Sequence, residues 1–467
     1  MPKKRPQKKK IQEDEPPENT ARPEKKPQTF DEYHCSGNVQ IDFPALCALL
    51  NVKEIPAVWT RHSTSSTIRD KQLEINSAPR DWSKPCLEAE LENENPLSTK
   101  EVKVSGWKVD EQMFKVLLKV LPSIRLLHGL HFWQAGLKEE MLISLMEVVS
   151  LSASLRSLTL EGNVLPNQSF HLLLPEGSVL THLSLRNNRI GDEGARLIGA
   201  ALSTTRSANS NLLSLNLAFN SIGDAGAVHI AQGLRFNRTL LYLSLCNNHI
   251  GDSGAADLAT ILGEFALTHE EVVERRKLLL QRKQAESLFA EQLASALDTS
   301  LSVGKGENKS LSRKKEASRK DEELTNIKEK SKKKSDTKGR KSEQKEAESP
   351  VDDSSVSLNK EEELVERVPP LLEESVYRRD GQLFLPGNST LESLNLAGNR
   401  ITEKSLPLFL KSLEMQEERG GLLRLCLQRN LFPPECECYM EIKNQMELRL
   451  SRQKQTETTE EEETVLD

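Results

Sequence analysis

The sequence contains few residues whose types and spacing match a catalytic or metal site. Cys436 and Cys438 form a close pair of cysteines, but no second pair or nearby histidine supplies the four ligands that a structural zinc site needs. His182 lies among regularly spaced leucines, where an ordinary surface histidine is more common than a metal ligand or a general base. We therefore expect no metal site, no cofactor and no catalytic residue.

The motifs of common enzyme classes are also missing from the sequence. It contains no G-x-x-x-x-G-K-[ST] loop, no G-x-G-x-x-G after a strand pattern, no H-E-x-x-H and no G-x-S-x-G. The pair His269-Glu270 continues with Glu271, Val272 and Val273, so it does not open a zinc-protease motif. These absences favour a binding protein over an enzyme.

Polar and aromatic residues alternate with leucines in three segments, and this alternation predicts a binding face. Successive side chains of a strand point to opposite faces, so the residues between buried leucines point to solvent. Arginine and aromatic residues are enriched in binding hot spots. The convex helices are the alternative binding surface. We expect a partner-binding concave face formed by His182, Ser184, Arg186, Asn187, Asn216, Phe219, Tyr242, Ser244 and Asn247.

These segments belong to a repeated pattern, L-x-x-L-x-L-x-x-N-x-L. Two weaker copies lie upstream, where Trp107 and Ala135 occupy the asparagine position. The interval of 28 residues from Trp107 to Ala135 recurs from Ala135 to Asn163, which makes a chance match implausible. The six clear copies carry Asn163, Asn188, Asn220, Asn248, Asn399 and Asn430.

Each position of the pattern has a physical reason. The leucines point inward from a short strand and stack on those of neighbouring units. The asparagine amide can bond backbone groups that would otherwise lack partners. Three units continue with Ile-Gly-Asp-x-Gly-Ala, and we expect Asp192, Asp224 and Asp252 to cap the helix that follows each of them. The pattern predicts a curved α/β solenoid of strand–helix units about 28 residues long, with strands on the concave side.

The pattern resembles the ribonuclease-inhibitor type of leucine-rich repeat, which occurs also in the GTPase activators of Ran and in cytoskeletal and ciliary proteins. The resemblance covers Val102 to Gly263 and Leu383 to Phe432 and is more specific for fold than for function. It implies a non-catalytic scaffold or adaptor for protein partners, with the ciliary axoneme as one setting. It also implies an alternative, a regulator of a small GTPase in which Arg186 or Arg189 reaches the bound nucleotide.

Composition divides the chain into six segments. Stretches of Lys, Glu, Ser and Pro cannot bury a core, and a long loop between two units adds little closure entropy. The predicted segments are a disordered basic tail at 1–33, an irregular flank at 34–98, about six repeat units at 99–263, an insert that is helical and then disordered at 264–382, the final repeats and cap at 383–450, and a disordered acidic tail at 451–467.

Charge and cysteine content limit the partners and the cellular setting. Basic clusters at 3–10 and 332–341 favour, as a third alternative, a nuclear factor that contacts nucleic acid, although such clusters are more often solvated tails. Ser331, Ser335 and Ser342 in the insert are candidate phosphorylation sites. The sequence has no apolar run of 18 residues, no secretory signal and seven scattered cysteines. We expect a cytoplasmic protein, with the cilium and the nucleus as narrower alternatives, and no membrane or small-molecule partner.

Overall fold

The computed structural model describes residues 29–62, 85–302, 368–416 and 420–464. The chain forms two compact units, Met1–Leu278 with Val368–Asp467, and Leu279–Arg367. The described part of the second unit is the continuation of helix α7 (His269–Ser302). The basic cluster at 3–10, the candidate phosphorylation sites and the charged part of the insert lie outside the described residues.

The first unit is built on one sheet of ten strands whose order follows the chain. Neighbouring strands are parallel except for the antiparallel pair β2–β3. Eight of the strands, β3 to β8, β12 and β13, are the predicted repeat strands. The strands are β1 Ala57–His62, β2 Cys86–Leu91, β3 Thr99–Ser105, β4 Gly129–Trp133, β5 Ser157–Glu161, β6 His182–Ser184, β7 Ser214–Asn216, β8 Tyr242–Ser244, β12 Ser393–Asn395 and β13 Arg424–Cys426.

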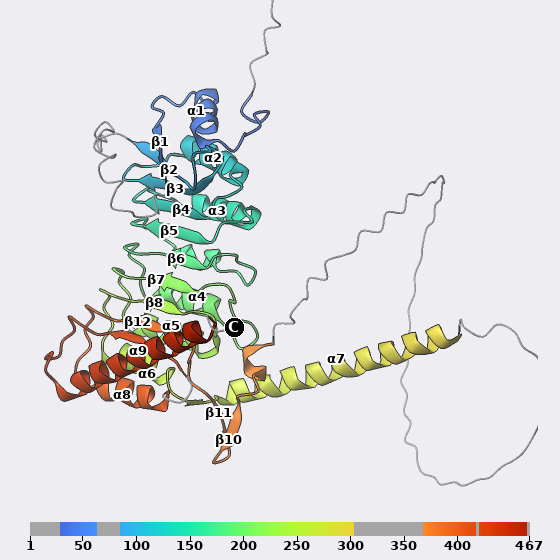
Figure 1. Ribbon diagram of the computed structural model, residues 1–467, viewed down its shortest axis with the longest axis vertical. Coiled ribbons are helices and arrows are strands. Elements are labelled where there is room, and N and C mark those ends of the chain that lie inside the picture. The colour runs from blue at the N-terminus through green and yellow to red at the C-terminus, as the bar shows by residue number, and fades with distance from the viewer. Residues whose placement is uncertain (1–28, 63–84, 303–367, 417–419, 465–467) are drawn as a thin grey trace, which may run out of the picture. The chain divides into compact units, whose positions relative to one another are not determined.

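Helices follow the repeat strands and form a layer beside the sheet (Figure 1). The leucines of the pattern, such as Leu183, Leu215 and Leu243, are buried between the two layers in one continuous core. This alternation of strand and helix in a parallel sheet confirms the predicted α/β solenoid. The layer contains α2 Glu111–Val120, η3 Leu121–Ser123, α3 Glu139–Leu151, η4 Ser169–Leu173, α4 Asp192–Leu202, α5 Asp224–Phe236, α6 Asp252–Thr260 and α8 Leu406–Met415.

The predicted asparagine ladder is present. The buried Asn220 side chain accepts hydrogen bonds from the backbone N–H groups of Asn188 (2.9 Å) and Ile190 (3.0 Å). Its amide donates to the carbonyl oxygens of Leu185 (3.0 Å) and Leu217 (2.9 Å). Asn248, Asn399 and Asn430 bond their neighbouring units in the same way. Each asparagine therefore ties one turn of the solenoid to the turn before it.

The helix-capping prediction for the aspartates was wrong about which helix they cap. Each aspartate is the first residue of its own helix, and glycine occupies the N-cap position there. Asp252 accepts from Thr402 N in the turn before α8 and from the Ser405 hydroxyl. The Asp224 carboxylate accepts from backbone N–H groups at the start of the next helix in the stack: its Oδ1 lies 2.6 Å from Gly251 N and 3.0 Å from Gly254 N. Asp192 caps α5 in the same way, so this contact also fastens neighbouring units.

We expect Asp224→Ala to lower the free energy of unfolding by about 1–2 kcal/mol, because it removes two bonds at a helix start. Asp224→Asn keeps an oxygen at the Oδ1 position and should retain most of that stability. Urea titration followed by circular dichroism would measure both variants. Equal stability of Asp224→Ala and the unchanged protein would contradict this account of the contact.

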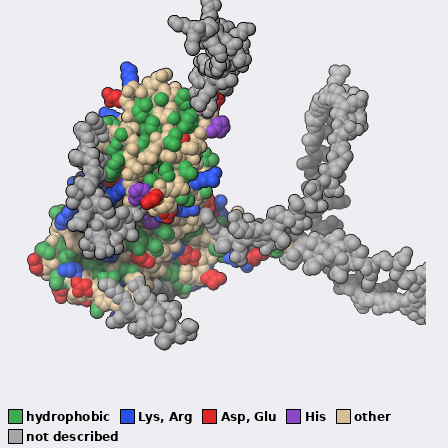
Figure 2. All heavy atoms as spheres, turned by 45° about the horizontal axis from the view of Figure 1, so that its top comes forward, with side chains coloured by type: hydrophobic (Ala, Val, Ile, Leu, Met, Phe, Trp, Pro, Cys, Tyr) green, Lys and Arg blue, Asp and Glu red, His purple; other side chains and the backbone are tan. Residues whose placement is uncertain are grey.

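The N-terminal flank is more regular than predicted. Residues 34–98 contribute helix α1 (Val39–Leu49) and strands β1 and β2, which extend the repeat sheet. The flank lacks the repeat template, but Leu87 and Ala89 alternate with polar residues, and they are buried in the main core. Figure 2 shows hydrophobic side chains gathered on the N-terminal end of the described residues, where Ile41 and Trp59 are exposed.

The ends of the insert are anchored in a small second hydrophobic core, which includes Leu278 and Leu371. The insert begins with strand β9 (Phe265–Ala266), and helix α7 follows it. Its last residues form η5 (Pro370–Leu372), β10 (Tyr377–Arg379) and β11 (Gln382–Leu385), and β10, β11 and β9 make an antiparallel sheet. Residues 383–385, expected to open the final repeats, therefore belong to the sheet that anchors the insert.

Helix α9 (Glu437–Thr464) includes most of the predicted acidic tail, since Glu, Gln and Lys favour helices.

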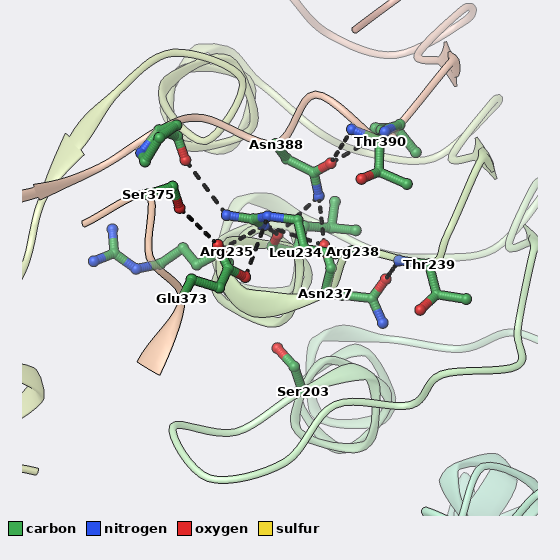
Figure 3. Close-up of polar contacts among 12 residues, drawn as sticks. Ser203, Leu234, Arg235, Asn237, Arg238, Thr239, Glu373, Ser375, Asn388 and Thr390 are labelled. Carbon is green, nitrogen blue, oxygen red and sulfur yellow. Dashed lines mark hydrogen bonds and ion pairs between the residues drawn. The ribbon is translucent and has the colours of Figure 1, made fainter. Parts of the chain in front are cut away.

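A second asparagine ladder, which the sequence analysis missed, rejoins the repeats after the insert (Figure 3). The Asn388 amide donates to the carbonyl oxygens of Leu234 (2.9 Å) and Asn237 (3.0 Å), 154 and 151 residues earlier in the chain. Arg238 beside it contacts Glu373 at 3.7 Å. Burial lowers the pKa of Arg238, and Glu373 acts in the opposite direction. These bonds set β12 directly beside β8, in the place of the next repeat.

Candidate functional site: the strand face

The outward side chains of strands β4 to β8, β12 and β13 form one surface, which we call the strand face. The sheet register aligns His182 with Ser214 and Tyr242, and Ser184 with Asn216 and Ser244. The predicted residues from three separate segments therefore lie in continuous rows across neighbouring strands. His182 and Tyr242 are exposed, whereas Ser184, Asn216 and Ser244 are half-buried.

Phe219 is the most unusual residue of this surface. The residue before the repeat asparagine has a positive φ in every unit from β6 onward, and the other units place Asn187, Asn247, Gly398 or Arg429 there. Phe219 has φ +57° and is 46% exposed. A bulky side chain is disfavoured in this left-handed conformation. Such strain persists only where the surroundings impose it, and it occurs often at functional sites.

The Phe219 ring contacts an arginine that is itself held by a carboxylate. The Arg186 guanidinium lies 4.3 Å from the centre of the Phe219 ring, which is a cation–π distance. Arg186 also lies 3.7 Å from Glu161, whose other carboxylate oxygen accepts from the Ser184 hydroxyl at 2.6 Å. These contacts hold the guanidinium against the ring while its side chain remains 40% exposed.

Two members of this cluster were missed by the sequence analysis. Trp133 is 45% exposed and pairs in register with Glu161 on the next strand. Both residues occupy the position that Arg186 has in its own unit. Arg186 follows Leu185, Glu161 follows Leu160, and Trp133 follows Phe132, which replaces the leucine there. The sequence contains the information needed to find them, because the outward position of Arg186 can be aligned with the same position in the preceding copies of the repeat.

Several predicted residues also make bonds within the local structure. Asn216 accepts from the backbone N–H of Ala218, and the Asn247 amide donates to the Cys246 sulfur at 3.0 Å. The Tyr242 hydroxyl donates to Glu392 at 3.1 Å, and this bond raises the pKa of Tyr242. Thr181 Oγ1 lies 2.8 Å from His182 Nδ1. The exposed part of the site therefore centres on Phe219 and Arg186, with Trp133 at one end and Tyr242 at the other.

Small apolar residues continue the strand face beyond Phe219. Ala218, Cys246 and Ala397 form a buried cluster on neighbouring units, and Cys426 packs against it. Burial raises the pKa of the Cys426 thiol, although Arg424 acts against this shift.

Cys436 and Cys438 are free thiols near the start of α9. Among the described residues no group of three or more His, Cys, Asp or Glu side chains is arranged to hold a metal ion.

A comparison with known protein families matches the strand-face units. The Leucine Rich repeat model matches residues 178–199, 208–231, 236–259 and 387–406. The chain carries leucine-rich repeats. The matched segments contain β6, β7, β8 and β12, and they support a role in binding protein partners. In the part of the chain that the structure describes, no helix is long and apolar enough to cross a membrane.

Proposed function

We propose that this leucine-rich repeat protein is a non-catalytic scaffold or adaptor that binds a protein partner through the strand face. The observation that carries the proposal is Phe219, a half-exposed aromatic ring held in a strained conformation beside Arg186. Asn or Gly at this position would remove the strain, as in neighbouring units. A binding role for the ring gives a reason for phenylalanine at a position that disfavours it.

The residue types around Phe219 support the same conclusion. Tryptophan, tyrosine and arginine are the residues that most often dominate the energy of protein interfaces. Trp133 on β4, Arg186 just after β6 and Tyr242 on β8 supply all three across five successive strands, and Trp133 and Tyr242 are exposed. Parallel strands are about 4.8 Å apart, so these side chains fit a partner surface that extends across several repeats.

The resemblance to repeat proteins of cytoskeletal and ciliary assemblies favours the ciliary axoneme as the setting, and the cytoplasm more broadly. The GTPase-regulator alternative is less well supported. An arginine finger must reach into a nucleotide site, and the Arg186 guanidinium instead contacts Phe219 and Glu161 of the strand face. The basic clusters that favoured a nuclear factor lie outside the described residues.

The test is affinity capture from ciliated-cell lysate, with bound proteins quantified by mass spectrometry. The full-length protein is compared with a His182→Ala/Arg186→Glu/Tyr242→Ala variant whose folding is checked by circular dichroism. We expect the unchanged protein to retain axonemal or cytoskeletal proteins and the variant to lose them. Equal retention by both would contradict the strand-face site, and capture of a GTPase instead would contradict the scaffold role.

A further inference from the structure

A second binding surface arises where one repeat unit lacks its α-helix. The unit between β5 and β6 is short, because 25 residues separate Asn163 from Asn188. It has only the five-residue 3₁₀ helix η4, whereas the units on either side have α3 with 13 residues and α4 with 11. A 3₁₀ turn of this length cannot cover the flank of a 13-residue helix.

The uncovered flank of α3 forms an apolar groove of about 410 Å³. One wall is the α3 stripe Ile143, Met146, Glu147 and Ser150, and Leu172 and Val179 belong to the opposite side. Ile143 is 53% exposed, and Leu151 at the end of α3 is 72% exposed. Exposed apolar side chains that gather in a groove mark interaction sites more often than single exposed residues do.

The shape of the groove fits a helix. Four of the five α3 residues that line it, Ile143, Met146, Glu147 and Ser150, follow the i, i+3, i+4, i+7 spacing of one helix face, and the fifth is the buried Val149. Neighbouring helices pack about 8–10 Å apart by fitting such stripes into each other's grooves. A partner helix packed along α3 would lie between α3 and α4. It would supply the helix that this repeat unit, which has only η4, lacks.

The charge of the groove selects the partner. Its lining includes the acidic Glu147 and contains no Lys or Arg. Glu147 makes no ion pair with any other described residue. We propose that this groove binds an amphipathic helix of a protein partner, with apolar side chains between α3 and η4 and a Lys or Arg beside Glu147. This surface differs from the strand face and does not depend on it.

The test uses a fluorescent alanine-based helical peptide with leucines along one face and lysines beside them, and a second peptide with glutamates in place of the lysines. Anisotropy titrations with the full-length protein should show that it prefers the lysine peptide. Ile143→Glu should weaken that binding at least about tenfold, a loss of about 1.4 kcal/mol. Glu147→Lys should reverse the preference in favour of the glutamate peptide.

Ile41→Glu is the matched control, because Ile41 is a helical residue 58% exposed on α1, away from the groove. This variant and Phe219→Asn should bind the lysine peptide like the unchanged protein, which separates this proposal from the strand-face proposal. Failure of the unchanged protein to bind, or binding that survives Ile143→Glu, would overturn the inference. So would a dimer of the unchanged protein that Ile143→Glu converts to a monomer, because a second copy would then occupy the groove.

Discussion

Asn220→Ala is expected to lower the free energy of unfolding by about 3 kcal/mol. The side chain is 5% exposed and satisfies two backbone N–H groups and one carbonyl group of the preceding turn, together with one carbonyl group of its own turn. Each buried polar group left without a partner costs about 1–3 kcal/mol. Movement of the turns and entry of water would recover part of this cost. The expected loss of stability is therefore smaller than the summed cost of the four unpaired backbone groups.

Asn216→Ala is the control for this prediction. Asn216 is half-buried on the preceding strand and accepts one bond within its own turn, from Ala218 N at 3.0 Å. Its loss should cost no more than about 1 kcal/mol. Urea unfolding followed by circular dichroism would compare the two variants. Similar unfolding midpoints for Asn216→Ala and Asn220→Ala would show that the ladder adds nothing beyond an ordinary turn bond.

Gly199→Ala is expected to destabilise the protein by about 2–3 kcal/mol, despite the better helix propensity of alanine. A Cβ atom at Gly199 would lie 2.2 Å from the carbonyl oxygen of His229 in α5. That atom belongs to backbone and cannot move aside by a rotamer change, so α4 and α5 must separate. The helix propensity of alanine is about 1 kcal/mol more favourable than that of glycine. Overpacking that forces backbone to move costs up to about 3 kcal/mol, or occasionally more.

Gly177→Ala distinguishes steric overlap from a general effect of replacing glycine. No atom lies within 4 Å of a Cβ placed at Gly177, and alanine reduces the freedom of the unfolded chain there. The free energy of unfolding should change by less than about 1 kcal/mol and in the stabilising direction. Thermal unfolding would measure both variants, and a Gly199→Ala protein as stable as Gly177→Ala would contradict the close helix contact.

The repeat units were predictable because the leucine and asparagine positions follow directly from physical requirements. Leu183 and Leu185 face the core at the two-residue period of a strand, and Asn188 bonds backbone that would otherwise lack partners. The role of Asp224 was not predictable in the same way. Its spacing marks a helix start, but the sequence of one unit does not say which neighbouring unit the carboxylate reaches.

Other features left a signal that the repeat template did not capture. The flank strand β2 alternates Leu87, Ala89 and Leu91 with polar residues, but it has no repeat asparagine. The strain at Phe219 could have been inferred from Asn187 and Asn247, because asparagine at the equivalent position indicates a left-handed backbone. The side-chain network around Arg186 depends on three adjacent strands and required the structure.

The most direct test of the strand-face account measures stability and partner capture on Phe219→Asn. Asparagine tolerates the left-handed conformation, so the variant should be as stable as the unchanged protein or more stable by up to about 1 kcal/mol. Loss of a hot-spot side chain costs at least about 2 kcal/mol of binding, or about 30-fold in affinity. Leu126→Asn, at the same exposed fraction of 46%, is the control. The account predicts that Phe219→Asn alone loses the captured partner while remaining fully folded. Unchanged capture by that stable variant would contradict it.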